Sequence, residues 1–250
     1  MLSRWCILSG NFWEVKMINK TVILIGSEGK IGEAIRDNMT EKGIDVIGTK
    51  IDQINLKDPF YQRFLEEYIC RYETEDFSEF SVVYNAGVDR LDWIKHQDWS
   101  DIEECFNVNT FGLMRALRGF SKNALAKRFV HVCSISATVP QTCTLAYNSS
   151  KAAARMASFT TARELAPLGK YVNVVSPGPV ADTAMTDYVT HRVPDLRGWS
   201  FEEAEEKQMS VVPLRRRIIP EEVANAVAFL LDGELSGAFV GAELRVSGGL

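Results

Sequence analysis

The chain has 250 residues, of which 46% are hydrophobic, and its formal net charge is −5. This length and composition suit one α/β domain with a substantial core and exclude a disordered chain. The negative charge gives no basic footprint, and no apolar run approaches the roughly 20 residues that span a bilayer, so we expect neither nucleic acid nor membrane as a partner. Five scattered cysteines without a CxxC pair predict free thiols in a reducing cytoplasm, and three isolated histidines predict no metal site.

Residues 1–16 differ in character from the rest of the chain. They lack the ordered charged, apolar and small-residue regions of a signal peptide. A second methionine, Met17, stands immediately before the first predicted strand, and W-E-V-K-M back-translates to a bacterial ribosome-binding sequence. We therefore expect a non-native or disordered leader over 1–16 and a single folded domain over 17–250.

Strand-like apolar runs alternate with helix-like stretches beyond the leader. In order, strands are predicted over 22–25, 45–48, 81–84, 129–133, 171–175 and 238–246, and helices over 59–72, 102–127, 146–166 and 220–231. This alternation predicts a doubly wound parallel sheet with helices on both faces and a ligand crevice at the carboxyl ends of the strands. The segment of about 179–217 has no strand signal and predicts a mobile substrate flap with short helices over that edge.

Three glycines follow the first strand in V-I-L-I-G-S-E-G-K-I-G. Gly26, Gly29 and Gly32 lie between this strand and a helix-like stretch. Such a loop directs backbone N–H groups and a helix N-terminus at one point, which favours a bound phosphate. Alone, the pattern fits an ordinary tight turn equally well.

The stretch A-Y-N-S-S-K places Tyr147 and Lys151 one helical turn apart, on one face of a predicted helix. A nearby ammonium stabilises a phenolate and lowers the tyrosine pKa from about 10, which makes the phenol a more effective proton donor or acceptor near neutral pH. By itself such a pair is more often a chance arrangement on the surface.

These motifs occur together with others in a recognisable order. They are N-A-G at 85–87, F-N-V-N-T-F-G at 106–112, C-S-I-S at 133–136, S-P-G-P-V at 176–180 and the ending R-V-S-G-G. Over about 21–249 the chain resembles the short-chain dehydrogenase/reductase family. The resemblance implies a single Rossmann-type domain that transfers a hydride between NAD(P)(H) and a carbonyl/alcohol substrate.

The resemblance also implies a catalytic set. Tyr147 would protonate the carbonyl oxygen during reduction, and Lys151 would lower the pKa of Tyr147 and bind the nicotinamide ribose. Ser134 would hold the substrate oxygen, with Ser136 as the alternative, and Asn109 would bind a water of a proton relay. Cys133 next to Ser134 could be a nucleophile, but no activating histidine pair accompanies it, so a core thiol is the better interpretation.

The cofactor contacts implied by the resemblance occur all along the predicted edge. Lys50 ends the second strand, where NAD-preferring members carry an acid, and this favours NADP(H). Glu28 and Asp52 would oppose an additional phosphate, so NAD(H) stays possible. The implied contacts are Gly26, Ser27, Gly29, Lys30, Ile31, Gly32, Lys50, Asn55, Asn85, Ala86, Gly87, Pro177, Gly178, Val180 and Thr183, together with Tyr147 and Lys151.

Two positions depart from the family pattern. The compact branch of the family has its middle glycine where this chain has Lys30, so the loop is atypical. Tyr84 replaces the first asparagine of the common N-N-A-G, which we interpret as a core substitution.

Several alternatives remain open. Within the family, the general character of the sequence is similar to that of 3-oxoacyl-thioester reductases. Apolar positions such as Phe111 and Met114 suit either an internal face or the helix pairing of a homodimer or homotetramer. A catalytically silent nucleotide-binding sensor or subunit is a rival function, as is an epimerase or dehydratase that retains the cofactor. The complete set of asparagine, serine, tyrosine and lysine favours an oxidoreductase over a sensor.

Overall fold

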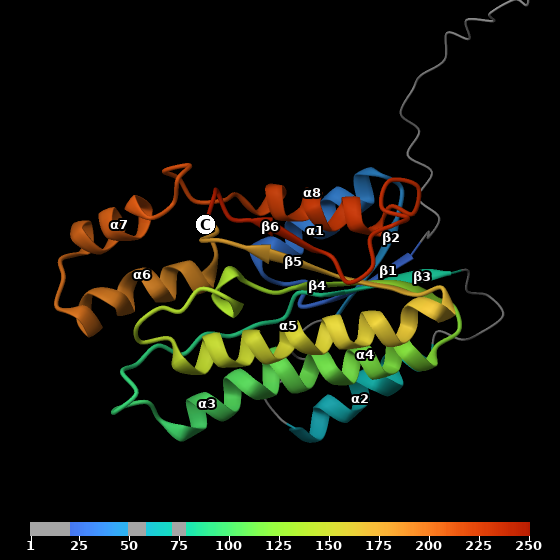
Figure 1. Cartoon of the computed structure of the whole chain (residues 1–250), viewed down its shortest axis with the longest axis horizontal. Helices are drawn as coiled ribbons and strands as arrows, with labels where there is room; N and C mark the ends of the chain where they lie inside the picture. The colour runs from blue at the N-terminus through green and yellow to red at the C-terminus, as the bar shows by residue number, and fades with distance from the viewer. Residues whose placement is uncertain (1–20, 50–58, 72–78) are drawn as a thin grey trace, which may run out of the picture.

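A six-stranded parallel sheet forms the centre of the molecule (Figure 1). The computed structural model describes residues 21–49, 59–71 and 79–250, and only the backbone over 59–64, so the predictions for Lys50, Asn55 and the leader lie outside the described residues. The strand order is β2-β1-β3-β4-β5-β6, which confirms the predicted doubly wound sheet. The strands are β1 (Thr21–Ile25), β2 (Asp45–Thr49), β3 (Phe80–Tyr84), β4 (Ala126–Val132), β5 (Tyr171–Pro177) and β6 (Glu243–Val246).

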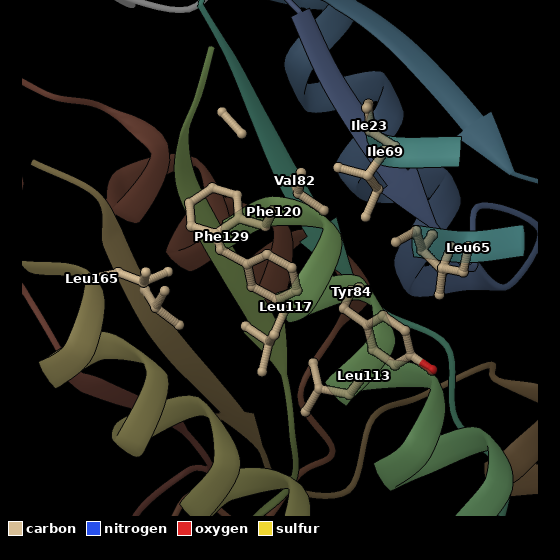
Figure 2. Packing of buried hydrophobic residues seen from close by; sticks show 14 of the residues in the cluster. Ile23, Leu65, Ile69, Val82, Tyr84, Leu113, Leu117, Phe120, Phe129 and Leu165 are labelled. Atoms are coloured by element: carbon tan, nitrogen blue, oxygen red, sulfur yellow. The ribbon is translucent and has the colours of Figure 1, made fainter. Parts of the chain in front are cut away.

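Helices cover both faces of the sheet. Helices α1 (Lys30–Glu41) and α8 (Pro220–Leu231) lie on one face, and α2 (Pro59–Cys70), α4 (Leu113–Lys122) and α5 (Leu145–Leu165) on the other (Figure 1). Alternate strand residues face opposite layers, so Ile23 and Val82 join one hydrophobic cluster whereas Leu24 and Val83 join the other. Figure 2 shows the first cluster, in which Phe120 and Phe129 make an edge-to-face contact with ring centroids 5.4 Å apart.

The strand order creates a switch point between β1 and β3. These neighbouring strands lead into loops that continue in opposite directions along the sheet. The two loops are joined because Asn85 Nδ2 donates to the Gly26 carbonyl at 2.8 Å and the Asn85 N–H donates to the Ile25 carbonyl at 2.8 Å. The crevice expected at the carboxyl edge therefore begins at this junction.

The helix predicted over 102–127 is present, but it runs without a break from 99 to 122 and contains a π-helical turn. It consists of α3 (Trp99–Phe106), a π-helical turn η1 (Asn107–Gly112) and α4. Within the turn, the Tyr84 hydroxyl donates to the Val108 carbonyl at 2.5 Å. A Cβ on Gly112 would lie 2.4 Å from the Tyr84 oxygen, so the missing side chain makes room for the phenol. Tyr84 is fully buried, which confirms that it is a core substitution.

Two element ends also differ from the prediction. Helix α4 stops at Lys122, where the Lys170 ammonium donates to the carbonyls of Phe120 at 2.8 Å and Asn123 at 2.6 Å and satisfies the helix end. The last strand is confined to Glu243–Val246 because the preceding chain turns at Gly241, whose φ is +63°.

The segment of about 179–217 contains two helices beyond the carboxyl edge of the sheet, α6 (Ala184–Arg197) and α7 (Phe201–Ser210) (Figure 1). The short helices predicted there are therefore confirmed. Ser200 starts α7 with a capping box, in which its hydroxyl accepts the Glu203 N–H and the Glu203 carboxylate accepts the Ser200 N–H. Over the described ranges, no helix is long and apolar enough to cross a bilayer.

Candidate active site

Tyr147 and Lys151 lie on the first turns of α5 and line one cavity of about 180 Å³ at the carboxyl edge of the sheet. Their exposed fractions are 7% and 3%. The Lys151 ammonium lies 5.8 Å from the centroid of the Tyr147 ring, and it also donates to the Val132 carbonyl at 3.5 Å. The structure thus brings the predicted pair together on one helix face.

Ser134 lies at the end of β4, where the chain turns toward α5. Its extended backbone starts a short 3₁₀ turn, and its hydroxyl oxygen accepts the Ser136 N–H at 3.1 Å. Ser134 also makes a side-chain hydrogen bond with Tyr147, which acts to lower the pKa of the phenol. Ser136 lines the same cavity, but the contact with Tyr147 is made by Ser134.

Burial determines the protonation of the pair. It raises the pKa of Tyr147, and the charge of Asp89 raises it further. Burial also lowers the pKa of Lys151. The pKa of Tyr147 is therefore raised and not lowered, because removal from water disfavours the phenolate more than Ser134 stabilises it, and a lowering by Lys151 itself stays a prediction. At neutral pH, Tyr147 is a protonated phenol.

Asn109 ties the loop after β3 to helix α5. The side chain is fully buried, its Oδ1 accepts the Val88 N–H at 2.9 Å, and its Nδ2 donates to the Val88 carbonyl and the Ser150 hydroxyl, both at 2.9 Å. A Cβ on Gly87 would lie 3.2 Å from the Lys151 nitrogen and 3.3 Å from Asn109 Oδ1. Gly87 therefore leaves room for the lysine and the asparagine beneath the loop. The water that Asn109 is predicted to bind stays a prediction.

The glycine loop has the shape of an anion cradle. Gly26 has a φ of +83°, and a Cβ there would lie 2.6 Å from the Ala86 nitrogen, while a Cβ on Gly32 would lie 2.5 Å from the Gly26 carbonyl oxygen. Gly29 is the N-cap of the twelve-residue helix α1, it has no side-chain cap, and a Cβ there would meet nothing within 4 Å. The first turn of α1 is therefore open to a ligand, and this fits the pyrophosphate of a dinucleotide.

Two polar side chains of this loop point elsewhere. The Ser27 hydroxyl donates to the Thr49 carbonyl at 3.1 Å and so joins the loop to the end of β2. The Lys30 ammonium forms an exposed ion pair with Glu33 at 2.9 Å. Ile31 lines the cavity together with Asn85.

The opposite rim of the cavity follows β5. The Gly178 N–H donates to the Val246 carbonyl at 2.9 Å, and a Cβ on Gly178 would lie 3.0 Å from the Ser247 Cα. Pro177, Gly178, Val180 and Thr183 all line the cavity, as the predicted cofactor contacts require. The Thr183 hydroxyl oxygen accepts the Thr186 N–H at 3.0 Å, so this side chain caps α6.

Asp89 is a site residue that the sequence analysis missed. Its exposed fraction is 7%, it lines the cavity that contains Tyr147, and its Oδ1 is buried without a hydrogen-bond partner. Burial raises the pKa of Asp89 to about 7. The sequence does contain one indication of this residue, because Asp89 is an acidic residue two positions after the N-A-G motif, which was itself assigned to the site.

Cys133 lines the cavity as a buried thiol. Burial raises the pKa of the Cys133 thiol, whose Sγ lies 3.6 Å from the Lys151 carbonyl oxygen, so the core-thiol interpretation is confirmed. The four described cysteines are free. Within the described residues, no group of histidine, cysteine or acidic side chains could hold a metal ion.

Comparisons with known proteins agree with this geometry. The adh_short_C2 family model, described as Enoyl-(Acyl carrier protein) reductase, matches residues 67–250. A diacetyl reductase ((S)-acetoin forming) from Staphylococcus epidermidis is 28% identical over 93% of this chain and 99% of its own length. A 3-oxoacyl-(acyl-carrier-protein) reductase from Vibrio cholerae is 29% identical over 92% of this chain and 97% of its own.

Solved structures share the fold over almost the whole chain. The ligand-free aldohexose dehydrogenase of Thermoplasma acidophilum has a TM-score of 0.77 and 26% identity and covers 94% of this chain and 95% of its own. An NAD⁺-bound xylitol dehydrogenase has a TM-score of 0.80 and 21% identity and covers 94% of this chain and 100% of its own. The chain therefore belongs to the short-chain dehydrogenase/reductase family of NAD(P)-dependent oxidoreductases.

Proposed function

We propose that the protein transfers a hydride between NADP(H) and a small carbonyl/alcohol substrate, with Tyr147 as the acid or base. The observation that carries the proposal is the convergence of Tyr147, Lys151 and Ser134 on one buried cavity beside an open helix N-terminus. A silent nucleotide-binding sensor has no physical need for a buried lysine beside a tyrosine that hydrogen-bonds a serine.

The roles follow from protonation and position. Nicotinamide, when bound, supplies the hydride in reduction and accepts it in oxidation. In reduction, the Tyr147 hydroxyl gives its proton to the carbonyl oxygen as the carbon gains the hydride, and the product is an alcohol. Ser134 donates to the same oxygen and holds it beside the phenol. Lys151 then stabilises the phenolate until solvent returns the proton, by way of a water held near Asn109.

The protonation state of Tyr147 suits the reductive direction. Its raised pKa keeps the phenol protonated at neutral pH, as a general acid requires. In oxidation, the same group would first have to lose its proton before it could accept one from the alcohol. We therefore propose carbonyl reduction as the faster direction at neutral pH.

The cofactor contacts are proposed to be those implied by the sequence. Gly26, Gly29 and Gly32 would hold the pyrophosphate, and Lys50 would favour the 2′-phosphate of NADP(H), with NAD(H) as the alternative. Ser27 and Asn85 would act by holding the loop, since their side chains are engaged with neighbouring backbone.

The proposed location and assembly rest on the cysteines and on one exposed groove. The four free cysteines support a reducing cytoplasm. Met114 and Met156 are exposed and border a groove between α4 and α5, which supports a homodimer or homotetramer formed through these helices.

The substrate class follows the relatives. Similar proteins are named for diacetyl, glucose and 3-oxoacyl substrates, all of which are carbonyl/alcohol pairs. We therefore propose small ketones first and 3-oxoacyl thioesters second. The test is titration with NADH and NADPH by nucleotide fluorescence, followed by turnover on a panel of ketones and acyl thioesters. Binding without turnover on any of them would favour the sensor, and interconversion of alcohol epimers without net nicotinamide reduction would favour an epimerase.

A further inference from the structure

Asp89 stands between the catalytic cavity and a second, larger one. The second cavity has a volume of about 540 Å³ and lies under α6 and α7. Both cavities are lined by Asp89, Ile135 and Gln141, so they adjoin at this point. A substrate whose reacting carbon is near Tyr147 and whose remainder occupies the second cavity would pass beside the carboxylate.

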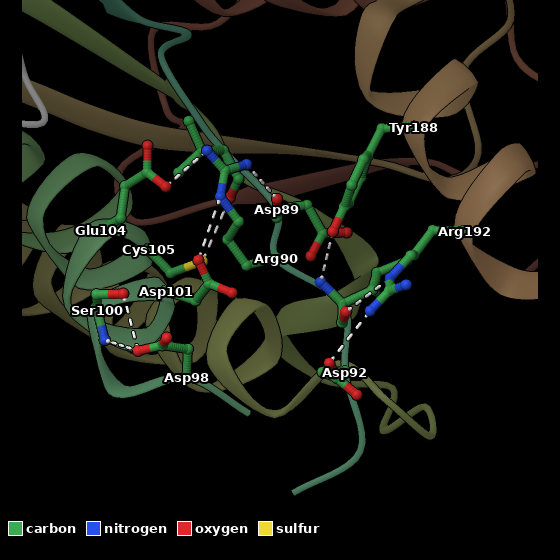
Figure 3. A network of polar contacts seen from close by, with 12 residues as sticks. Asp89, Arg90, Asp92, Asp98, Ser100, Asp101, Glu104, Cys105, Tyr188 and Arg192 are labelled. Atoms are coloured by element: carbon green, nitrogen blue, oxygen red, sulfur yellow. Dashed lines mark hydrogen bonds and ion pairs between the residues drawn. The ribbon is translucent and has the colours of Figure 1, made fainter. Parts of the chain in front are cut away.

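The chain satisfies this carboxylate only in part. The Arg90 N–H donates to the carboxyl group, but Asp89 Oδ1 is buried and has no hydrogen-bond partner among the described residues. The adjacent guanidinium of Arg90 is turned toward α3, where it pairs with Glu104 at 2.6 Å and Asp101 at 3.7 Å (Figure 3). The nearest cation of the catalytic set, Lys151, acts on Asp89 through its charge only.

Gln141 and Gln208 also line both cavities, yet within the described residues Asp89 Oδ1 receives no hydrogen bond. Above the loop, the Tyr188 hydroxyl oxygen of α6 accepts the Leu91 N–H at 3.0 Å, and Arg192 pairs with Asp92 at 3.2 Å (Figure 3). The second cavity has a mixed lining, with Leu91, Ile135 and Val189 among its apolar side chains and Gln141 and Gln208 among its polar ones. An unpaired buried acceptor is costly unless a ligand supplies the donor.

We propose that Asp89 binds a hydroxyl group on the carbon next to the reacting carbon, so that the preferred substrates are 2-hydroxy ketones and the corresponding vicinal diols. The inference rests on the proposed carbonyl/alcohol function and specifies its substrate class. The hydroxyl of such a substrate would donate a hydrogen bond to Asp89 Oδ1, whereas a ketone without this hydroxyl would leave Oδ1 without a partner and out of contact with water. A site with a buried acceptor discriminates strongly against a substrate that lacks the hydroxyl. An apolar pocket discriminates less strongly against a substrate that has an additional hydroxyl.

The test compares 1-hydroxybutan-2-one with butan-2-one. At pH 8, where the Asp89 carboxyl is mostly ionised, a hydrogen bond to this charged group contributes roughly 1.5–3 kcal/mol, so we expect wild-type kcat/KM to favour the hydroxy ketone by about 10-fold to 150-fold. Asp89→Leu should bring the ratio of the two kcat/KM values close to one, whatever it does to the rate on either ketone alone, and Asp89→Asn should leave a small preference. The matched control is Asp92→Asn, which lies on the same loop in a partly buried ion pair with Arg192 and should keep the wild-type ratio.

A binding measurement makes the test independent of turnover. Butane-1,2-diol should raise the unfolding temperature of the wild type more than butan-2-ol does, and the difference should vanish in Asp89→Leu. Equal ratios in wild type and Asp89→Leu, or equal stabilisation by the two alcohols in the wild type, would overturn the assignment. If butan-2-one is reduced while the preference is absent, the proposed function stands and only Asp89 is misassigned. If no carbonyl is reduced but the diol still binds selectively, the assignment stands and the proposed reaction fails.

Discussion

Replacing Asp89 by asparagine should stabilise the protein, and the gain should grow with pH. The carboxyl is almost fully buried, and its pKa is raised from an ordinary 3.8 to about 7. The folded protein therefore keeps this proton over a pH range in which the unfolded chain has lost it. The unfolded state consequently gains relative stability as pH rises from about 4 to about 7, and the loss is complete above the folded pKa.

The size of the effect follows from that difference in pKa. At about 1.4 kcal/mol for each pH unit, the ionised carboxylate costs the fold about 4 kcal/mol well above pH 7. Between pH 5 and pH 8 the cost rises by about 2.5 kcal/mol, which corresponds to a change of roughly 5–10 °C in Tm for a chain of this size. Asparagine does not titrate, so it escapes this cost.

The assay is thermal or urea unfolding of wild type and Asp89→Asn, without cofactor, at pH 5 to 8. Subtracting the two curves removes the titration of groups that both proteins share. The groups that act on Asp89 are Arg90 in the same loop, Cys105 on α3, and Tyr147 and Lys151 on α5. A difference that is constant across this range, or that shrinks toward pH 8, would show that the carboxylate is compensated in solution and would refute the reasoning.

Three other substitutions test separate parts of the structure. Gly112→Ala should cost about 1–3 kcal/mol, because the new Cβ would lie 2.4 Å from the Tyr84 oxygen, and Tyr84→Phe should relieve part of that cost; additive free energies of unfolding in a double-mutant cycle would contradict this contact. Gly29→Ala should keep wild-type stability yet weaken binding of NADPH at least ~10-fold by covering the first turn of α1, as measured by nucleotide fluorescence; unchanged affinity would argue against the cradle. Met114→Lys should dissociate the proposed oligomer in light scattering with little change in the stability of the single chain, and an unchanged mass would place the interface elsewhere.

The fold could be predicted because it depends on local patterns. Buried β-branched runs alternate with helix-like stretches, and each run matched a strand of the sheet within a few residues. The glycine positions could also be interpreted, since Gly26 and Gly32 are required by close backbone contacts that no other residue permits.

Features that depend on distant contacts could not be predicted. The π-helical turn at Asn107–Gly112 is held by a hydrogen bond from the Tyr84 hydroxyl. Tyr84 lies on β3, which is separated from this turn in the sequence by a loop and α3. Likewise, the termination of α4 is completed by Lys170, which comes from the start of a later strand. The helical periodicity of the sequence does not indicate either contact.

The pKa values of the site residues depend on how deeply each side chain is buried, and burial cannot be inferred from the motifs. The pattern of tyrosine and lysine predicted a lowered pKa for Tyr147, but the depth of the phenol and the charge of Asp89 reverse the direction. Asp89 itself belongs to no motif, and only the three-dimensional structure reveals that its Oδ1 is buried without a partner.

The most direct test of the account is single-turnover reduction of a 2-hydroxy ketone by wild type and Tyr147→Phe, each preloaded with NADPH. Loss of the reduced-nicotinamide absorbance reports hydride transfer, and fluorescence of the same samples reports cofactor binding. The account predicts equal NADPH affinity in the two proteins and a rate in Tyr147→Phe that is lower by at least ~100-fold, because the phenol supplies the proton. A variant that binds NADPH normally and reduces the ketone at the wild-type rate would contradict the assignment of Tyr147 as the acid.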